Sequence, residues 1–339
     1  MIKRNLPTLE EVAKAAKVST ATASRCLNEP HKVSAKTRER VLEIVKQLRY
    51  SPNFGARAIA ANRTNTYGVV IPTMENAIFA RGIEAFQQTL RNHNATMLVA
   101  SSSYDPEQEE HQIRTMIARG ADGLMLIGTQ RDPEIYSFLS DRNIPLVIAW
   151  ACPSDKSHSY VGFDNRSSMK QLAQKAIELG HRSFAYISAK TRMNDRAHNR
   201  ILGAKDALKG AGIDPDSMPI IETNQSIECG REAFHDVIAN NARPTVIFGG
   251  NDVLAVGALQ GAREAGLSVP DDICITGFDD IELATVTNPA LTTVHVPHRD
   301  MGSIAAETLF SMVKESTGPH HIKLDTYIVE RATLAPLKN

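Results

Sequence analysis

The sequence predicts an α/β protein in which an N-terminal helix-turn-helix precedes doubly wound parallel sheets. Three observations support this prediction. Helix-capping signals are closely spaced in the first fifty residues, basic residues are concentrated in the same region, and apolar runs alternate with helical patterns from Tyr67 onward. With 339 residues, the chain is long enough for two or three domains.

The first fifty residues carry the capping signals. Thr8 and Glu11 have the spacing of a capping box, and they open a helix whose apolar face includes Leu9 and Val12. Ser19 can cap a second helix after a turn of about three residues, which is the spacing of a helix-turn-helix. The second helix of that motif lies in the major groove of DNA, so its first residues are candidate base contacts: Thr20, Ala21, Ser24 and Arg25. An ordinary pair of surface helices would show the same spacing.

Charge favours the DNA-binding interpretation. Residues 1–63 contain 13 Lys or Arg against 5 Glu, a net charge of +8, whereas the whole chain sums to zero. Residues 64–339 therefore carry −8. A basic region of this kind matches the phosphate backbone, whose neutralisation dominates the affinity for DNA. A solvated charged surface is the alternative, but it does not explain why the asymmetry coincides with the helix-turn-helix.

A third helix and a short helical segment follow. Ser34 can cap a helix that extends through Leu48, and Pro52 must end any helix before it. Beyond Pro52, helical spacing connects three apolar residues, Ala56, Ile59 and Ala60. Since a helix of about nine residues is marginal alone in water, we expect it to form only when something orders it.

The remainder of the chain alternates between strand-like and helical patterns. Apolar runs with the length of buried strands occupy residues 67–72, 95–101, 123–128, 145–150, 160–164, 183–189, 245–250 and 273–279. Helix-length segments between them include residues 81–92, 106–119, 166–179, 200–210 and 252–265. This alternation predicts a parallel sheet covered by helices on both faces. Because roughly 270 residues are available, more than one such sheet needs, two similar subdomains are expected.

Several protein classes find no support in the sequence. The N-terminus has no apolar core of a signal peptide, and no stretch approaches the length of a membrane span, so we expect a cytoplasmic protein without a membrane partner. The four cysteines are widely separated, with no C-x-x-C pair. Phosphate-loop, nucleophile-elbow and H-E-x-x-H motifs are absent, so no enzyme activity, catalytic residue, metal or cofactor is predicted. A transport binding protein would need a signal peptide and no basic N-terminal region.

Ordered matches along nearly the whole chain resemble the Lac repressor family of transcriptional regulators. They include Val12-Ala13, Val18-Ser19, Ser24-Arg25, Leu27-Asn28, Pro52-Asn53, Gly250-Asn251-Asp252, Gly277-Phe278-Asp279-Asp280 and Leu291-Thr292-Thr293-Val294. The resemblance implies a DNA-binding headpiece (1–50), a hinge helix (51–63) and an effector-binding core of the periplasmic-binding-protein type. That core would have two parallel-sheet subdomains, one of residues 64–162 with 294–322 and one of residues 163–293 with 323–339. It also implies a homodimer that binds a near-palindromic operator.

The resemblance carries a DNA-binding role to positions in the headpiece and hinge. These are Thr8, Ser19, Thr20, Ala21, Thr22, Ser24, Arg25, Asn28, Ser34, Thr37, Asn53, Arg57 and Ile59. Three residues depart from the family pattern. Lys17 stands where Gly or Asn is usual, and it costs on the order of 1 kcal/mol more than Gly if its backbone is left-handed. Ala23 replaces a common Val in a small core, and Ile59 replaces a Leu that wedges between base pairs, a role that Ile can still fill unless it contacts a second hinge helix instead.

An effector cleft is expected where parallel strands end, because such sheets bind ligands beyond the carboxyl ends of their strands. Asp164, Asn251 and Asp279 end or follow predicted strands, so we expect them to converge. Arg200 is expected to open the helix after another strand, and it matches an effector-contacting Arg of the family. The predicted effector-binding set is Asp164, Arg196, Arg200, Asn251, Asp279 and His298.

Each of these residues also has a purely structural interpretation. Asn251 is a good helix cap, Arg200 and Asp279 could form a plain ion pair, and His298 could be a satisfied polar residue of the core. As ligand groups, carboxylates and amides beside an Arg suit sugar hydroxyls or a carboxylate. The loop ahead of Phe79 is about three residues shorter than the family pattern, so pocket residues are not transferred from that stretch.

The effector class follows from charge and from the resemblance. Basic side chains near the predicted cleft would suit a sugar acid or sugar phosphate, although a solvated loop would look the same: Lys190, Arg192, Arg196 and Arg200. Residues 161–165 and 301–304 resemble gluconate-type repressors within the family. We therefore expect a ligand-responsive, sequence-specific DNA-binding regulator, foremost a repressor of carbohydrate or sugar-acid genes that a small effector releases. A corepressor-dependent or activating regulator is the alternative, and a sugar-binding protein or enzyme without a DNA role is a remote one. Residues 332–339 hold no heptad repeat, so we expect a dimer without a coiled-coil tail.

Overall fold

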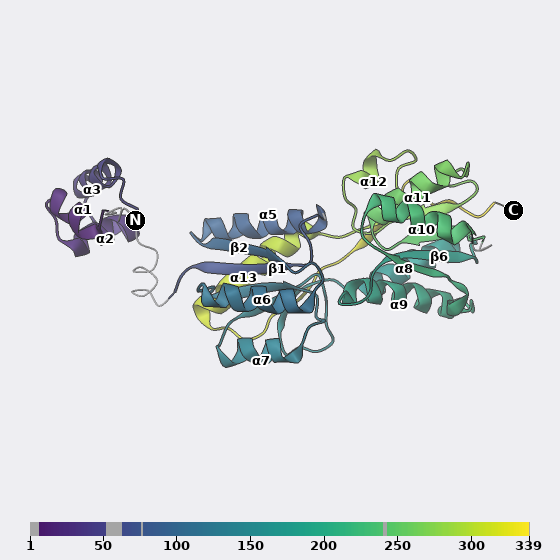
Figure 1. The fold of residues 1–339 in the computed structure, drawn as a ribbon, viewed down its shortest axis with the longest axis horizontal. Helices are drawn as coiled ribbons and strands as arrows, with labels where there is room; N and C mark the ends of the chain where they lie inside the picture. Colours follow the sequence, from purple (N-terminus) through teal and green to yellow (C-terminus); the bar gives the residue numbers. More distant parts are fainter. Residues whose placement is uncertain (1–6, 52–62, 76, 240–242, 339) are drawn as a thin grey trace. The chain divides into compact units, whose positions relative to one another are not determined.

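The computed structural model describes residues 7–51, 63–75, 77–239 and 243–338. The chain divides into two compact units, Met1–Thr64 and Asn65–Asn339 (Figure 1). Each unit has its own hydrophobic core. Within the described ranges, no helix combines the length and apolar character needed to cross a membrane.

The first unit contains three α-helices, as predicted: α1 (Leu9–Ala15), α2 (Thr20–Asn28) and α3 (Ala35–Gln47). Each begins at its expected cap. Thr8 and Glu11 form the reciprocal capping box, and the Ser19 hydroxyl accepts a hydrogen bond from the Thr22 amide at 3.1 Å. A 3-10 turn, Pro30–Lys32, connects α2 to α3. The helices enclose a small core of Val12, Ala13, Ala16, Ala23, Cys26 and Val41.

The turn between α1 and α2 contains the departure expected at Lys17. Its φ of 54° is left-handed, so the cost relative to Gly, on the order of 1 kcal/mol, applies. Ala23 has no exposed surface and lies in the centre of this small core. The first unit therefore folds with less apolar burial and more backbone strain than the family pattern would give it.

The first lobe of the second unit is built on a six-stranded parallel sheet in the order β11-β5-β4-β3-β1-β2. Its strands are β1 (Thr66–Ile71), β2 (Thr96–Ser101), β3 (Gly123–Ile127), β4 (Leu146–Ala149), β5 (Ser159–Gly162) and β11 (His321–Lys323). One face packs on α5 (Ala77–Asn92) and α13 (His298–Glu315), and the other on α6 (Pro106–Ala118) and α7 (Pro133–Asp141). Successive strand residues point to opposite faces, so Val69 and Val70 belong to different cores.

The second lobe is built on a four-stranded parallel sheet in the order β7-β6-β8-β9. Its strands are β6 (Phe184–Ala189), β7 (Ile220–Thr223), β8 (Val246–Gly249) and β9 (Cys274–Thr276). One face packs on α8 (Asn165–Glu178) and α9 (Asp195–Gly210), and the other on α10 (Ile227–Ala239) and α11 (Asp252–Glu264). Smaller elements complete it: η2 (Pro215–Ser217), α12 (Leu283–Val286), and the antiparallel pair β10 (Thr293–His295) and β12 (Tyr327–Val329).

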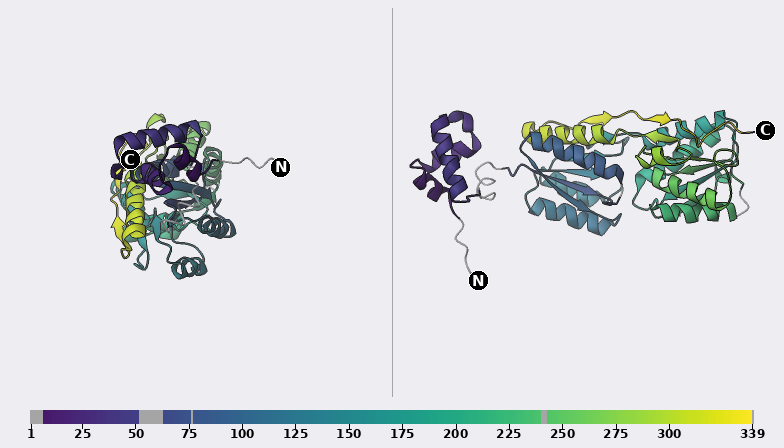
Figure 2. Two further views of the ribbon diagram at one scale, coloured as in Figure 1. Left: turned by 90° about the vertical axis from the view of Figure 1, so that its left-hand side faces the viewer. Right: turned by 90° about the horizontal axis from the view of Figure 1, so that it is seen from above.

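The chain passes between the lobes three times: after β5, between β10 and α13, and between β11 and β12. The last segment, drawn in yellow, runs along one side of both lobes (Figure 2). The predicted fold class is confirmed, while the predicted subdomain limits stay a prediction. Two helix starts were wrong. The first is α5, which begins at Ala77 and not at Arg81. In the second, Arg200 does not open its helix, because α9 begins at Asp195 after a cap by Asn194, whose side chain accepts a hydrogen bond from the Ala197 amide.

Candidate functional site

The predicted base-contacting helix presents its polar residues on the side away from the core. Its exposed members are Thr20, Ala21, Arg25 and Asn28, whereas Thr22 and Ser24 are half-buried. The Ser24 hydroxyl accepts a hydrogen bond from Asn28 Nδ2 at 3.2 Å. Between residues 7 and 51, the recorded ion pair joins Lys32 to Glu29, and no carboxylate holds Arg25. Arg25 is therefore free to reach a base edge or a phosphate.

Five of the predicted DNA-contact residues have a second role as caps or cap partners: Thr8, Ser19, Thr22, Ser34 and Thr37. The Ser34 hydroxyl donates a hydrogen bond to Thr37 Oγ1 at 2.9 Å, and Thr8 and Ser19 cap α1 and α2. Capping orients the helix N-termini, which are themselves suited to phosphate. Three further predicted contacts, Asn53, Arg57 and Ile59, lie outside the described residues.

A cleft of about 1120 Å³ lies between the two lobes of the second unit. Residues of the first lobe line one wall, and those of the second lobe line the other. The first wall consists of Thr73, Met74, Glu75, Ser101, Ser103, Tyr104, Asp105, Pro106 and Glu107. The second consists of Lys190, Arg192, Thr223, Asn224, Gln225 and Ser226. Both walls follow the carboxyl ends of strands, which is where ligands bind to parallel sheets.

The two walls differ in charge. Glu75, Asp105 and Glu107 belong to the first lobe, and Lys190 and Arg192 belong to the second. Most other lining side chains are neutral hydroxyls and amides. The cleft is thus strongly polar but nearly balanced in charge, so it is not the basic pocket that the sequence pattern of the second lobe suggested.

Behind the cleft, Arg200 is held in a buried polar cluster. Its Nε donates to Asn165 Oδ1 at 2.8 Å, its Nη1 to the Gly250 carbonyl at 2.8 Å, and its Nη2 to Asp279 Oδ1 at 3.3 Å. The guanidinium also lies 3.8 Å from the centre of the Phe278 ring. Burial raises the pKa of Asp279 to about 6, although Arg200 acts in the opposite direction. The predicted pairing of Arg200 with Asp279 is present as an ion pair.

His298 joins the two lobes from the same cluster. Trp150 Nε1 donates to His298 Nδ1 at 3.1 Å, so the ring proton lies on Nε2, which donates to the Asp279 carbonyl at 3.3 Å. Burial lowers the pKa of His298 to about 3, which keeps the ring neutral. Phe79 packs edge-on against Trp150 within α5. Phe79 is therefore part of α5 and of the core of the first lobe.

The expected convergence of three strand-end residues is only partly present. Asn251 caps α11, and its Nδ2 donates to Gln225 Oε1 at 3.3 Å. Asp164 caps α8 and pairs with Lys323 at 3.7 Å, and its role in effector binding stays a prediction. Because β5 ends at Gly162, Asp164 faces the helix N-terminus, and the next residue, Asn165, contacts Arg200.

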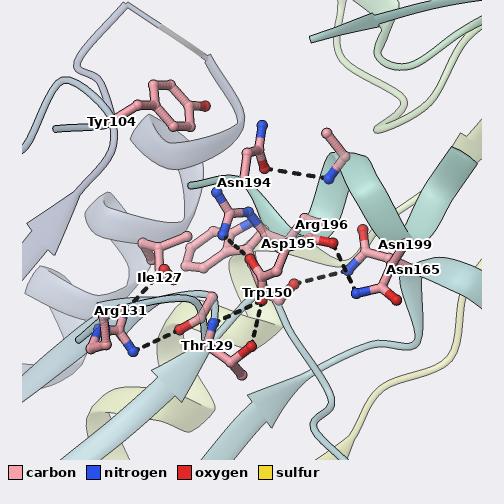
Figure 3. A network of polar contacts seen from close by, with 12 residues as sticks. Tyr104, Ile127, Thr129, Arg131, Trp150, Asn165, Asn194, Asp195, Arg196 and Asn199 are labelled. Carbon is pink, nitrogen blue, oxygen red and sulfur yellow. Dashed lines mark hydrogen bonds and ion pairs between the residues drawn. The ribbon is translucent and has the colours of Figure 1, made fainter. Parts of the chain in front are cut away.

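A second connection between the lobes centres on Asp195 (Figure 3). Its Oδ2 accepts hydrogen bonds from Thr129 N and Thr129 Oγ1, both at 2.8 Å, and its Oδ1 pairs with Arg196 Nη1 at 2.7 Å. Burial acts to raise the pKa of Asp195, but Arg196 and the Thr129 donors lower it overall. Arg131 is buried and donates to the carbonyls of Ile127 and Gly128, which holds the Thr129 loop in place.

Apart from Lys190 and Arg192, sequence reasoning did not identify the residues that line the cleft. A sequence signal for the lining does exist, because a polar run lies at the carboxyl end of β2 and another at that of β7. The runs are Ser101-Ser102-Ser103-Tyr104 and Thr223-Asn224-Gln225-Ser226. The Asp195–Thr129 connection had no such signal, since its partners are 66 residues apart and belong to different lobes.

The chain matches two protein-family models. Residues 8–53 match the bacterial regulatory proteins of the lacI family, and residues 173–334 match a periplasmic binding protein-like domain. Catabolite control protein A of Priestia megaterium is 30% identical over 310 residues, covering 91% of this chain and 93% of that protein. The HTH-type transcriptional repressor PurR of Klebsiella pneumoniae (strain 342) is 31% identical over 333 residues and 97% of both chains.

Solved structures agree with these matches. A lacI-family transcriptional regulator from Silicibacter pomeroyi superposes with a TM-score of 0.87 at 27% identity, covering 97% of this chain and 99% of that one. The complex of the transcriptional regulator CelR with cellobiose gives a TM-score of 0.72 at 27% identity, covering 96% and 99%. The Lac repressor dimer bound to operator shares the fold, with a TM-score of 0.86 at 24% identity and coverage of 97% and 99%. The chain therefore belongs to the lacI family of bacterial regulatory proteins, and it is a ligand-responsive, DNA-binding transcriptional regulator rather than an enzyme.

Proposed function

We propose that this regulator is a homodimeric repressor that a carbohydrate releases from a near-palindromic operator. The observation that carries the proposal is the cleft of about 1120 Å³ between the lobes. Eight of its lining side chains are neutral hydrogen-bonding groups: Thr73, Ser101, Ser103, Tyr104, Thr223, Asn224, Gln225 and Ser226. Hydroxyl and amide groups each offer donors and acceptors, which is what a polyhydroxylated ligand requires.

The charges in the cleft favour a neutral sugar or a singly charged sugar acid. Three carboxylates outnumber the two cations Lys190 and Arg192, so a sugar phosphate would meet repulsion on the wall of the first lobe. A single carboxylate could still pair with the two cations. The cellobiose complex of CelR, whose structure this chain resembles, supports the sugar class.

The buried cluster would control effector affinity from behind the cleft. Gln225 lines the cleft and accepts a hydrogen bond from Asn251. Gly250, which precedes Asn251, accepts a hydrogen bond from Arg200 through its carbonyl. Direct contact of Arg200 or Asp279 with the effector would require an exchange of their present hydrogen bonds. We propose the same supporting position for His298, while Arg196 would act through Asp195 at the second connection.

Operator binding would use α2 of each headpiece in the dimer, with Arg25 as the principal base-reading residue. Two copies related by a two-fold axis would place two recognition helices on the two half-sites of a near-palindrome. Leu283 and Val286 of α12 are exposed apolar residues that suit a subunit contact, and Val286 is 74% exposed.

The test is a thermal-shift screen of the full-length protein against sugars, sugar acids, sugar phosphates and purines, followed by operator titrations. A ligand specific to the folded state raises the unfolding temperature. We expect a sugar or sugar acid to do so and to weaken operator binding by about 1 to 3 kcal/mol. Tighter operator binding would instead identify a corepressor. A stabilising purine without any effect of sugars would contradict the carbohydrate assignment.

A further inference from the structure

We propose that Tyr104 and Gln225 form a pair that closes the cleft over the effector and selects a ligand with an apolar ring face, such as a pyranose. The inference rests on the proposed function of the cleft as a carbohydrate site. The two side chains come from opposite lobes, both line the cleft, and Gln225 Nε2 donates to the Tyr104 hydroxyl at 2.7 Å. This hydrogen bond connects the two walls of the cleft directly.

Tyr104 is presented by a tightly held turn after β2. The Ser102 amide donates to the Ile71 carbonyl and the Asp105 amide donates to the Ser102 carbonyl, both at 2.9 Å. Between these anchors, Ser103 and Tyr104 have φ values of 53° and 58°, which is left-handed backbone for two successive residues with side chains. Such strain persists only where the surrounding structure imposes it, and it is concentrated at ligand sites. The turn therefore fixes the backbone from which Tyr104 reaches the cleft, and the hydrogen bond to Gln225 holds its side chain.

Gln225 is oriented by its contacts in the second lobe. Its Oε1 accepts from Asn251 Nδ2 at 3.3 Å, which directs its Nε2 toward Tyr104. Ser226 follows, and its hydroxyl accepts a hydrogen bond from the Cys229 amide at the start of α10. Gln225 is thus connected to the N-termini of both α10 and α11. A change at the Tyr104–Gln225 contact can reach Asn251 and, through Gly250, the Arg200 cluster.

The chemistry of the pair selects the ligand. Tyr104 is half-buried, and its ring is the one aromatic group among the cleft-lining residues. Aromatic faces bind the C–H face of a sugar ring, while the Tyr104 O–H proton, left available when the oxygen accepts from Gln225, can donate to a ligand hydroxyl. An open-chain polyol or a bare anion has no ring face to pack on Tyr104. The pair therefore favours ring-form saccharides over linear ones.

The experiment measures binding of D-glucose, D-sorbitol, D-gluconate and cellobiose to the full-length protein by calorimetry. For the tightest ring-form saccharide, Tyr104→Ala should weaken binding about tenfold or more, which corresponds to roughly 1.4 kcal/mol. Gln225→Met should weaken it about two- to fivefold and Tyr104→Phe at least as much. Combining them should add little to Tyr104→Phe, because that variant already lacks the hydrogen bond to Gln225. Tyr327→Ala is the matched control, since its exposed ring stacks on His295 and does not line the cleft.

The possible outcomes separate this inference from the proposed function. If a saccharide binds wild type and Tyr104→Ala equally well, the cleft remains a carbohydrate site but the pair does not select the ligand. If sorbitol or gluconate binds more tightly than glucose and cellobiose, the inference that the pair selects ring-form saccharides would also be overturned. If none of the four compounds binds wild type, the carbohydrate assignment and this inference both fail. Circular dichroism and the unfolding midpoint of each variant show whether a loss of binding is merely a loss of folding.

Discussion

At the scale of single residues, burial decides which side chains carry charge. His298 lies 3% exposed between Trp150 and the Asp279 carbonyl, and both of its ring nitrogens are used. Its alternative interpretation as a satisfied polar residue could be drawn from the sequence, but its partners could not. The sequence likewise did not show whether Asp164 or Asn165 contacts Arg200, because a shift of one residue at the end of a strand decides this.

The neutral state of His298 predicts a pH dependence of stability. Its pKa falls from 6.5 to about 3 on folding, so the unfolded chain binds an extra proton between these values. The stabilising effect is present above pH 6.5 and is lost as the pH falls, at up to about 1.4 kcal/mol per pH unit. His298→Gln should lower the free energy of unfolding at pH 7.5 but flatten its decline toward pH 5. Urea titrations at several pH values measure how steeply the free energy of unfolding falls with pH in wild type and in His298→Gln. Equal slopes in the two proteins would contradict the prediction.

Arg25 carries a prediction about sequence readout. If it contacts a guanine edge, Arg25→Ala should weaken binding to a selected operator by about 1 to 3 kcal/mol and weaken binding to random DNA less. Arg40→Ala, on the exposed side of α3, is the control for loss of one positive charge. Fluorescence anisotropy with both DNAs distinguishes the two roles. An equal loss on the two DNAs would mean that Arg25 contacts only phosphate.

At the scale of elements, the helices of the headpiece were predictable because their signals are local. Thr8, Ser19 and Ser34 each precede their helix, and the structure confirms every start. The strands β7, β10, β11 and β12 were not predicted. They are three or four residues long, and tertiary pairing specifies them more than any pattern of their own.

The turn at Lys17 predicts that the headpiece can be stabilised. Glycine adopts the left-handed conformation without the Cβ penalty, so Lys17→Gly should stabilise α1 and α2 by about 1 kcal/mol. Lys17→Ala removes the same side chain but retains the Cβ, so it should change stability by a few tenths of that. Hydrogen exchange of the α1 and α2 amides in the full-length protein measures the difference. Equal protection in both variants would show that the turn is not strained.

At the scale of the whole molecule, two parallel sheets and a cleft could be predicted, but not the contacts between the lobes. The His298–Asp279 contact, the Asp195–Thr129 connection and the Tyr104–Gln225 hydrogen bond join residues from the two lobes. No periodicity encodes such pairs. They depend on how the two lobes pack, which local sequence patterns do not specify.

Allostery predicts how changes in the cluster affect ligands. Arg200→Ala removes three hydrogen bonds and Asp279→Asn removes a buried charge, so each should cost about 1.5 to 3 kcal/mol of effector affinity. Operator affinity without effector should change far less. By thermodynamic linkage, the factor by which effector changes operator affinity must equal the factor by which operator changes effector affinity. If both variants bind effector like wild type but lose the operator, these residues only maintain the fold.

The late return of the chain to the first lobe determines when that lobe can be completed during synthesis. The edge strand β11 pairs with β5, and α13 packs beside α5, yet both lie beyond residue 297. On the ribosome, the headpiece has all of its own elements early, whereas the first lobe emerges with an open sheet edge and an uncovered apolar face. During that interval the second lobe is made except for β12 and the residues that follow it. The nascent chain therefore presents a finished DNA-binding module well before it can respond to any ligand.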